Sequence, residues 1–339
     1  MAQQGGGINA AQLFQMGAQQ QAQAPQQSAP VQPGANTWKC ACGATATGKF
    51  CPECGAKKPE PQPAAGWTCS CGAVNTGIAA ASGMYVKVVD ADDWVGPESL
   101  EQVMAVLRDE VGKDDPLDML VTNYVYDKVG KRNKHVVNFR HAMEPGKRLT
   151  WDDLGHFGLT EYILMHALIY RTAVVRESKM QLPEHTFYVD FIYAYQPFPW
   201  VKSLQYLDTP FYHYFIGRDG QSVQTDVMIR RVDQLRLVNQ CMVRATPERG
   251  TVPDGLYRYM IHFLAIESSV ASVFMILSRD HANYEKKKQL WADIKAYSPT
   301  IYADVRKKAM SRALNLHGSL GRFVIRKGYF VAEHVVGFN

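Results

Sequence analysis

Apolar and polar residues alternate in short runs through the middle of the chain. Met84–Val89 alternates and is rich in β-branched side chains, which predicts a strand. Leu117–Tyr126 predicts a second strand and Val136–His141 a third. Leu164–Tyr170 is a continuous apolar run that fits either a strand or a buried helix.

Helical spacing replaces this alternation at one point in the middle and throughout the last third of the chain. The predicted helices are Pro97–Glu110, Asp226–Met242, Leu256–Leu277, Tyr284–Tyr297 and Ile301–Leu314. A middle part that mixes strands and helices, followed by helices alone, is typical of an α/β domain joined to a helical region. We therefore divide this part of the chain into residues 75–225 and residues 226–339.

The beginning of the chain has a different composition. Residues 1–36 are rich in Gln, Ala, Gly and Pro and contain no charged side chain. Such a segment has too few large apolar groups to offset its ordering entropy, so it is expected to be a disordered tail. Residues 59–74 begin with a linker of Pro, Ala and Gln.

Charge and hydropathy exclude some classes of function. The net charge of +5 is too small to demand a nucleic-acid partner. No apolar run reaches the length of a bilayer span, and the best one, Phe263–Leu277, is interrupted by Glu267. The N-terminus has neither a basic start nor an apolar segment typical of a secretory signal. A cytoplasmic protein is expected.

Cysteines cluster near the N-terminus, where six of the seven fall between positions 40 and 71. Short spacings of this kind favour a metal site in a reducing compartment over disulfides. Within residues 37–58, a Cys-x-Cys pair and a Cys-x-x-Cys pair present four thiolates to one tetrahedral Zn²⁺. The predicted structural zinc ligands are Cys40, Cys42, Cys51 and Cys54.

The sequence around this predicted zinc ribbon then begins to repeat. Gly66–Gly72 matches Thr37–Gly43 closely, yet no second pair of cysteines follows Cys69 and Cys71. Residues 1 to about 77 resemble the Gln-rich tail with tandem zinc ribbons of bacterial SPFH-domain (virion-core-like) proteins. The second ribbon stops halfway, which leaves two thiols that we interpret as inert.

Three carboxylates follow the first predicted strand within four positions. Asp90 and Asp92 could share one hard cation, because Mg²⁺ and Mn²⁺ take carboxylate oxygens together with substrate phosphates. An acidic turn after an ordinary strand explains the same residues. The residues alone leave both interpretations open.

From Asn75 to Asn339 the chain resembles a family 2 glycosyltransferase of the GT-A type. The matching stretches are Asn75–Ile78, Ala81–Gly83, Val88–Trp94, Val121–Tyr124, Met165–His166, Leu182–Asp190 and Ile216–Val223. The resemblance implies a Rossmann-like α/β sheet with a C-terminal helical region. It also implies inverting transfer of a sugar from a nucleotide-diphospho-sugar to the hydroxyl of a glycan or a lipid-linked acceptor.

The resemblance assigns roles to individual residues. It makes Asp90 and Asp92 the Asp-x-Asp element that holds Mg²⁺ or Mn²⁺ at the diphosphate. It makes Asp190, at the end of a strand-like run, the general base, although Val189 replaces the Glu that usually precedes it. Donor and acceptor contacts are implied for Asn75, His166, Arg218, Gln221 and Ser222. The alternatives are a helix cap for Asp190 and a core side chain for His166.

The two resemblances meet at Asn75-Thr76-Gly77, and the family's opening nucleotide-binding strands are not matched before it. We therefore hypothesise a chimera with a partial, impaired GT-A domain. The alternative function is a non-catalytic zinc-ribbon scaffold fused to a degenerate domain.

The chain from Arg279 onward is basic, with twelve Lys and Arg residues against five Asp and Glu residues. This surplus is a solvated face, a surface for anionic lipid at the inner face of the membrane, or a surface for a phosphorylated acceptor.

Overall fold

The computed structural model describes residues 38–39, 45–46, 70–128, 134–216, 224–316 and 318–336. The described residues fall into two compact units, a smaller one with residues 38–46 and a larger one with residues 70–336. In the smaller unit, β1 (Trp38–Lys39) pairs antiparallel with β2 (Thr45–Ala46). The predicted tail of residues 1–36 lies outside the described residues. So do the predicted zinc ligands Cys40, Cys42, Cys51 and Cys54.

The larger unit is built on a mixed sheet. Its described strands follow the order β3 (Tyr85–Val86), β8 (Leu168–Arg171), β5 (Met119–Lys128), β9 (Leu204–Ile216) and β4 (Trp94–Val95). Two further strands pair beside this path, β6 (His135–Val137) with β5 and β7 (Arg148–Leu149) with β9. β5 and β9 run parallel, whereas the other pairs are antiparallel.

β5 lies at the centre of the sheet because its sequence is apolar or aromatic on both faces. Residues 119–126 are all buried, as expected for a strand that is covered on both sides. The predicted strand Leu117–Tyr126 is confirmed. The ambiguous run Leu164–Tyr170 contains both structures, a 3₁₀ turn η2 (Met165–Ala167) followed by β8.

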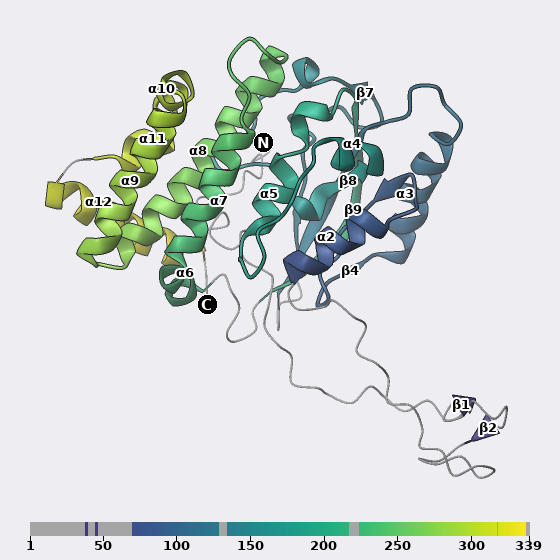
Figure 1. Ribbon diagram of the computed structural model, residues 1–339, viewed down its shortest axis with the longest axis horizontal. Helices are drawn as coiled ribbons and strands as arrows, with labels where there is room; N and C mark the ends of the chain where they lie inside the picture. The colour runs from purple at the N-terminus through teal and green to yellow at the C-terminus, as the bar shows by residue number, and fades with distance from the viewer. Residues whose placement is uncertain are drawn as a thin grey trace, which may run out of the picture. The chain divides into compact units, whose positions relative to one another are not determined.

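Short helices surround the sheet: α2 (Ser70–Ala80), α3 (Pro97–Asp109), α4 (Thr172–Glu177) and α5 (Val189–Tyr195), with the 3₁₀ turns η1 (Trp151–Asp153) and η3 (Phe198–Trp200). α3 confirms the predicted helix. Its buried Val103 and Leu107 pack in one cluster with Leu120 of β5 and Phe211 of β9. In Figure 1, α3 lies at the opposite end of the larger unit from α9 and α12.

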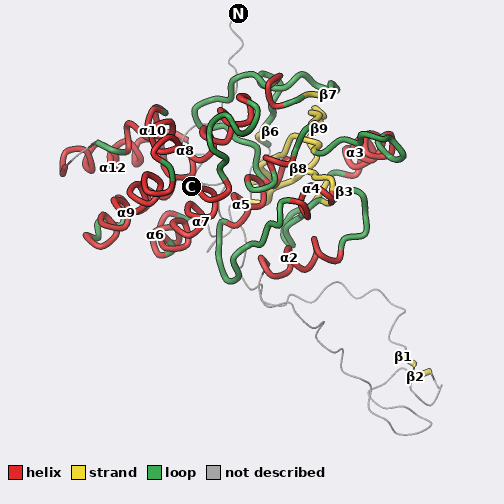
Figure 2. Tube along the Cα trace, turned by 45° about the horizontal axis from the view of Figure 1, so that its top comes forward, coloured by secondary structure: helices red, strands yellow, loops and turns green. Residues whose placement is uncertain are grey.

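The last third of the described chain is helical, which confirms the predicted C-terminal region. Its helices are α6 (Thr225–Arg230), α7 (Val232–Ala245), α8 (Asp254–Leu277), α9 (His281–Tyr297), α10 (Pro299–Lys307), α11 (Ala309–Leu314) and α12 (Gly318–Val336). Figure 2 shows these helices gathered in a block beside the strands. The α/β arrangement of a mixed sheet with helices around it, followed by a helical C-terminal region, agrees with this part of the predicted fold class.

α8 is the central helix of that block. By length and composition it could cross a membrane, yet 89% of its most apolar window is buried within the protein. Its beginning fits tightly against η1, since a Cβ on Gly255 would lie 2.1 Å from the carbonyl oxygen of Trp151. The Gly255 N–H donates to Asp152 Oδ1 at 2.6 Å. Only glycine allows this approach of the two backbones.

Several predicted elements differ from those observed. The strand predicted over Met84–Val89 is confined to β3, after which the chain turns. The prediction that a strand-like run ends on Asp190 is wrong. Tyr188 adopts a left-handed backbone with φ of 67°, and α5 begins at Val189 directly after it. The helix predicted over residues 226–242 breaks at Arg231, and the one over residues 301–314 breaks at Lys308, where ψ of 139° is extended.

Candidate active site

The acidic segment after β3 is a tight turn. The Asp93 N–H donates to the Asp90 carbonyl at 3.1 Å. Asp93 is then fixed from two sides, since its Oδ1 accepts from the Phe215 N–H at 2.8 Å and its Oδ2 from the Tyr212 hydroxyl at 2.6 Å. The Tyr212 hydroxyl also accepts from the Asp90 N–H at 3.2 Å. β9 therefore holds the turn through Tyr212.

His166 completes a group of three side chains that could hold a metal ion. One carboxylate oxygen each of Asp90 and Asp93 and one ring nitrogen of His166 all lie within 4.8 Å of one another. The predicted pair was Asp90 and Asp92, and Asp92 is not among these three. A turn closed between the first and fourth residues brings Asp90 and Asp93 together, which explains the difference.

The His166 ring is held by aromatic side chains. Its centroid lies 4.5 Å from that of Tyr214 and 4.9 Å from that of Tyr212. The residue is 2% exposed, and neither ring nitrogen has a hydrogen-bond partner among the described residues. Burial lowers the pKa of His166 to about 3, with a further contribution from Lys87. The imidazole is thus neutral, which is the form that binds metals.

Lys87 attaches the acidic turn to η2. Its ammonium donates to the carbonyls of Met165 at 2.7 Å and His166 at 2.8 Å, and it lies 4.6 Å from the centre of the Tyr212 ring. Burial lowers the pKa of Lys87 to about 7, while Asp90 and Asp93 act to raise it. The carboxyl groups of the acidic turn therefore favour the charged form of Lys87.

Asp190 lies in the first turn of α5 and is 5% exposed. Burial raises its pKa to about 7, although the backbone N–H groups of Phe191 and of Asp190 itself act to lower it. A rise is the effect expected when an apolar environment surrounds a carboxyl group. Tyr188, two residues earlier, has φ of 67°. A large side chain in this conformation is strained, and such strain is frequent at functional sites.

The charges of both acidic centres influence Tyr214. Burial raises its pKa, and the charges of Asp93, Asp190 and Asp90 raise it further, with a smaller contribution from Asp92. The Tyr214 ring also contacts His166. The acidic turn and Asp190 therefore act on the same hydroxyl group, although they come from segments a hundred positions apart.

The other predicted site residues divide into two groups. Asn75 lies on α2, where its side-chain amide donates to the Leu182 carbonyl and accepts from the Leu182 N–H, both at 3.0 Å. It thereby fixes the beginning of the segment that leads to Asp190. Arg218, Gln221 and Ser222 lie outside the described residues.

Sequence reasoning did not identify Asp93, Lys87 or Tyr212 as parts of the site. The carboxylate of Asp93 was visible in the acidic run, but only the turn geometry distinguishes it from Asp92. Lys87 interrupts the apolar strand pattern, and a lysine at such a position was a usable signal. Nothing in the sequence around Tyr212 distinguishes it from its aromatic neighbours on β9.

Comparisons with known proteins match part of the chain. Residues 70–171 match the model of the family described as Glycosyl transferase family 2. A stretch of 151 residues is 26% identical to "Putative glycosyltransferase EpsH" of Bacillus subtilis (strain 168) and covers 41% of this chain. The chain matches 40% of the length of that protein.

The family match includes every member of the candidate metal cluster, Asp90, Asp93 and His166, and ends before Asp190. It begins within α2, ahead of the tripeptide at which we placed the junction. The mixed α/β sheet and the helical region that follows it are consistent with a GT-A-like fold. Residues 70–171 are therefore similar to a glycosyl transferase family 2 domain, in both sequence and architecture.

Proposed function

We propose that the protein is an inverting glycosyltransferase that transfers a sugar from a nucleotide-diphospho-sugar to an acceptor hydroxyl. The observation that supports this most directly is that the two acidic centres both act electrostatically on Tyr214. One centre has the composition of a metal site, and the other is a single buried carboxyl with a raised pKa. Such a pair serves a reaction that needs a leaving diphosphate and an activated alcohol.

Asp90, Asp93 and His166 would hold the divalent cation. The unsatisfied nitrogens of the buried His166 fit this role, because a neutral imidazole with two carboxylates forms a mixed nitrogen and oxygen ligand set. Mg²⁺ prefers oxygen alone, so this set favours Mn²⁺. When bound, the cation would offset negative charge on the departing diphosphate. Asp92 remains a proposed ligand that would contact the cation in the substrate complex.

Asp190 would act as the general base. Its carboxylate accepts the proton of the acceptor hydroxyl while that oxygen bonds to the anomeric carbon. The bond from this carbon to the diphosphate oxygen breaks on the opposite face, and its electron pair leaves with the nucleoside diphosphate. A pKa of about 7 suits a base that must be ionised at neutral pH and still bind a proton well.

Further contacts complete the proposal. Arg218, Gln221 and Ser222, which follow β9 in the sequence, would contact the diphosphate of the donor. Asn75 would act through Leu182 as a positioning residue for the segment that contains Asp190. Glycans and lipid-linked sugars are the acceptor classes that we propose, and nucleic acid is not expected.

Peripheral contact with an anionic membrane is a further part of the proposal, at the cytoplasmic face. α12 combines basic side chains with apolar ones that are exposed, Leu320 at 73% and Phe323 at 51%. This composition is typical of a helix that lies in a bilayer interface. Sedimentation with anionic liposomes tests it, and absence of pelleting at low salt would contradict it.

We also propose a structural Zn²⁺ at Cys40, Cys42, Cys51 and Cys54. The antiparallel pairing of β1 with β2 supports this, because the two strands flank the first two of these cysteines in the sequence. Native mass spectrometry checks the zinc content. Replacing Cys51 with Ser should release the ion, and an unchanged zinc content would contradict the proposed site.

The enzymatic proposal is tested with a panel of UDP-, GDP- and dTDP-sugars in the presence of MnCl₂. We expect release of nucleoside diphosphate from at least one donor, and loss of this release in the Asp190→Asn variant. Nuclear magnetic resonance of the first product gives the anomeric configuration, which should be inverted. Silence across the panel, or a product of retained configuration, would contradict the proposal.

A further inference from the structure

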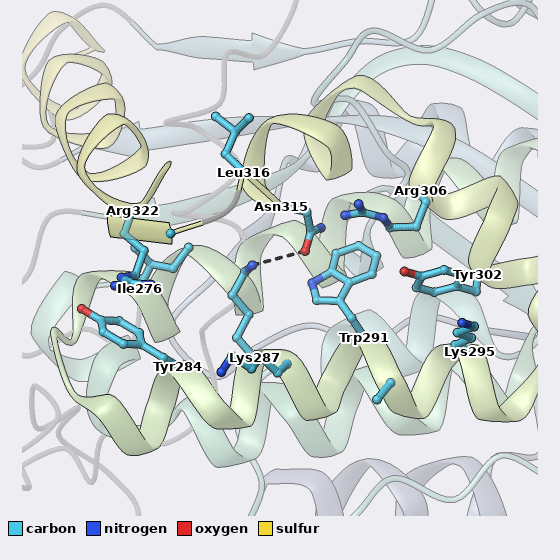
Figure 3. A pocket seen from close by; sticks show the side chains of 13 residues that line it. Ile276, Tyr284, Lys287, Trp291, Lys295, Tyr302, Arg306, Asn315, Leu316 and Arg322 are labelled. Atoms are coloured by element: carbon cyan, nitrogen blue, oxygen red, sulfur yellow. Dashed lines mark hydrogen bonds between the residues drawn. The ribbon is translucent and has the colours of Figure 1, made fainter. Parts of the chain in front are cut away.

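A cavity of about 400 Å³ lies among the C-terminal helices. Side chains of α8, α9, α10 and α12 line it (Figure 3), together with residues of the segment between α11 and α12. None of these elements contributes to the candidate active site. The cavity is thus a separate feature of the molecule and has no part in the chemistry proposed above.

The lining of this cavity is cationic. Five basic side chains line it, namely Lys287, Lys288, Lys295, Arg306 and Arg322, and no acidic side chain of the described residues does so. Among the described residues, only Lys288 of the five has an ion-pair partner, Glu285 at 2.7 Å. Lys286, the preceding residue on α9, pairs with Asp233 at 2.7 Å and is not part of the lining.

Three of these cations contact aromatic rings or an amide rather than a carboxylate. The Arg306 guanidinium lies 5.4 Å from the centre of the Trp291 ring, and that of Arg322 lies 4.8 Å from the Tyr284 ring. Lys287 donates to the Asn315 amide oxygen at 3.2 Å, as Figure 3 shows. This arrangement leaves several N–H donors available to an anion.

The neighbouring positive charges of the cavity also repel one another. Lys287 is half-buried, and burial lowers its pKa to about 8, with Arg306 and Arg322 adding to the effect. A protein gains nothing in stability from three like charges around a cavity that lacks a counter-ion. Arg and Lys together match the oxygens of a phosphate group, Arg through its planar fork and Lys as a point charge.

We propose that this cavity binds the phosphate group of a phosphate monoester or a diphosphate. Two sources offer the same chemistry, a soluble phosphate compound and the headgroup of an anionic lipid. Leu316, which is 49% exposed, lines the cavity and would contact acyl chains in the second case. The proposal is independent of glycosyl transfer, because its test measures binding alone.

The test compares Lys287→Met and Arg306→Gln with the matched control Lys286→Met, all in the full chain. Titration calorimetry with inorganic pyrophosphate and flotation with phosphatidylcholine vesicles containing phosphatidic acid give the two arms. We expect wild type and control to bind in at least one arm, and Lys287→Met to bind about tenfold more weakly or worse. Binding in the vesicle arm alone would assign the phosphate to a lipid.

A second measurement separates binding from folding. Without phosphate, Lys287→Met should melt at a temperature equal to or above that of wild type, because it removes a charge from a crowded cluster. With pyrophosphate or vesicles, the melting temperature of wild type should rise and that of the variant should not. Absence of binding in both arms, or equal losses in Lys287→Met and Lys286→Met, would overturn the proposal.

Discussion

Replacement of Asp190 by Asn should make the protein more stable and at the same time inactive. The Asp190 carboxyl is buried, and its pKa is raised from 3.8 to about 7. The folded protein therefore keeps this proton up to about pH 7, whereas the unfolded chain releases it above pH 3.8. Stability conferred by protonated Asp190 is complete below pH 3.8 and is lost as the pH rises to 7.

The size of the effect follows from the two pKa values. Each pKa unit corresponds to about 1.4 kcal/mol, so the loss reaches up to about 4 kcal/mol at pH 8. Asn resembles the protonated acid in shape and does not titrate. The variant should match wild type near pH 4 and exceed its free energy of unfolding by up to about 4 kcal/mol at pH 8. Loss of a general base should lower kcat by about 10²–10⁴-fold.

Urea denaturation in EDTA, followed by tryptophan fluorescence at pH 4 and pH 8, measures the stability difference. Glu267→Gln is the matched control, because Glu267 is fully buried in α8, with its pKa raised by burial to about 8, and lies outside the candidate site. The control should gain stability at pH 8 without loss of activity. If Asp190→Asn followed the pH dependence of wild type, or kept its turnover, the assignment of Asp190 would be wrong.

Two further sets of variants test the metal cluster and the fold. His166→Asn should weaken Mn²⁺ binding about tenfold or more in calorimetry without substrate, whereas Asp92→Asn should change it little; equal losses would restore the pair predicted from sequence. Gly255→Ala should lower the free energy of unfolding by about 1–3 kcal/mol, because its Cβ would collide with backbone of η1. Gly77→Ala, with open space around its Cβ in α2, should instead raise it by up to about 1 kcal/mol. Urea midpoints that moved in the same direction would contradict this packing argument.

The sequence predicted those elements whose own residues decide their structure. β5 was predictable because a run that is apolar on both faces has no stable place outside the core. α3 was predictable from Pro97 at its start and from the spacing of Val103 and Leu107. α8 and α9 were likewise visible, since helical periodicity over many residues is hard to satisfy in any other way.

The candidate site was less accessible to sequence reasoning, because tertiary contacts decide it. The turn that joins Asp90 to Asp93 depends on the Tyr212 hydroxyl, which belongs to a strand more than a hundred residues later. His166 was identified as a candidate, but its place beside the carboxylates follows from the sheet order. Asp190 was predicted at the end of a strand-like run, whereas the left-handed backbone of Tyr188 precedes a helix there.

The central claim is that Asp90, Asp93 and His166 form the metal centre of a glycosyltransferase. Anomalous diffraction at the manganese edge, from crystals soaked with MnCl₂ and a UDP-sugar, tests it most directly. We predict one strong peak within bonding distance, about 2.0–2.6 Å, of both carboxylates and the His166 ring, with the donor diphosphate on its open side. A peak elsewhere, or an empty cluster beside a bound donor, would contradict the account.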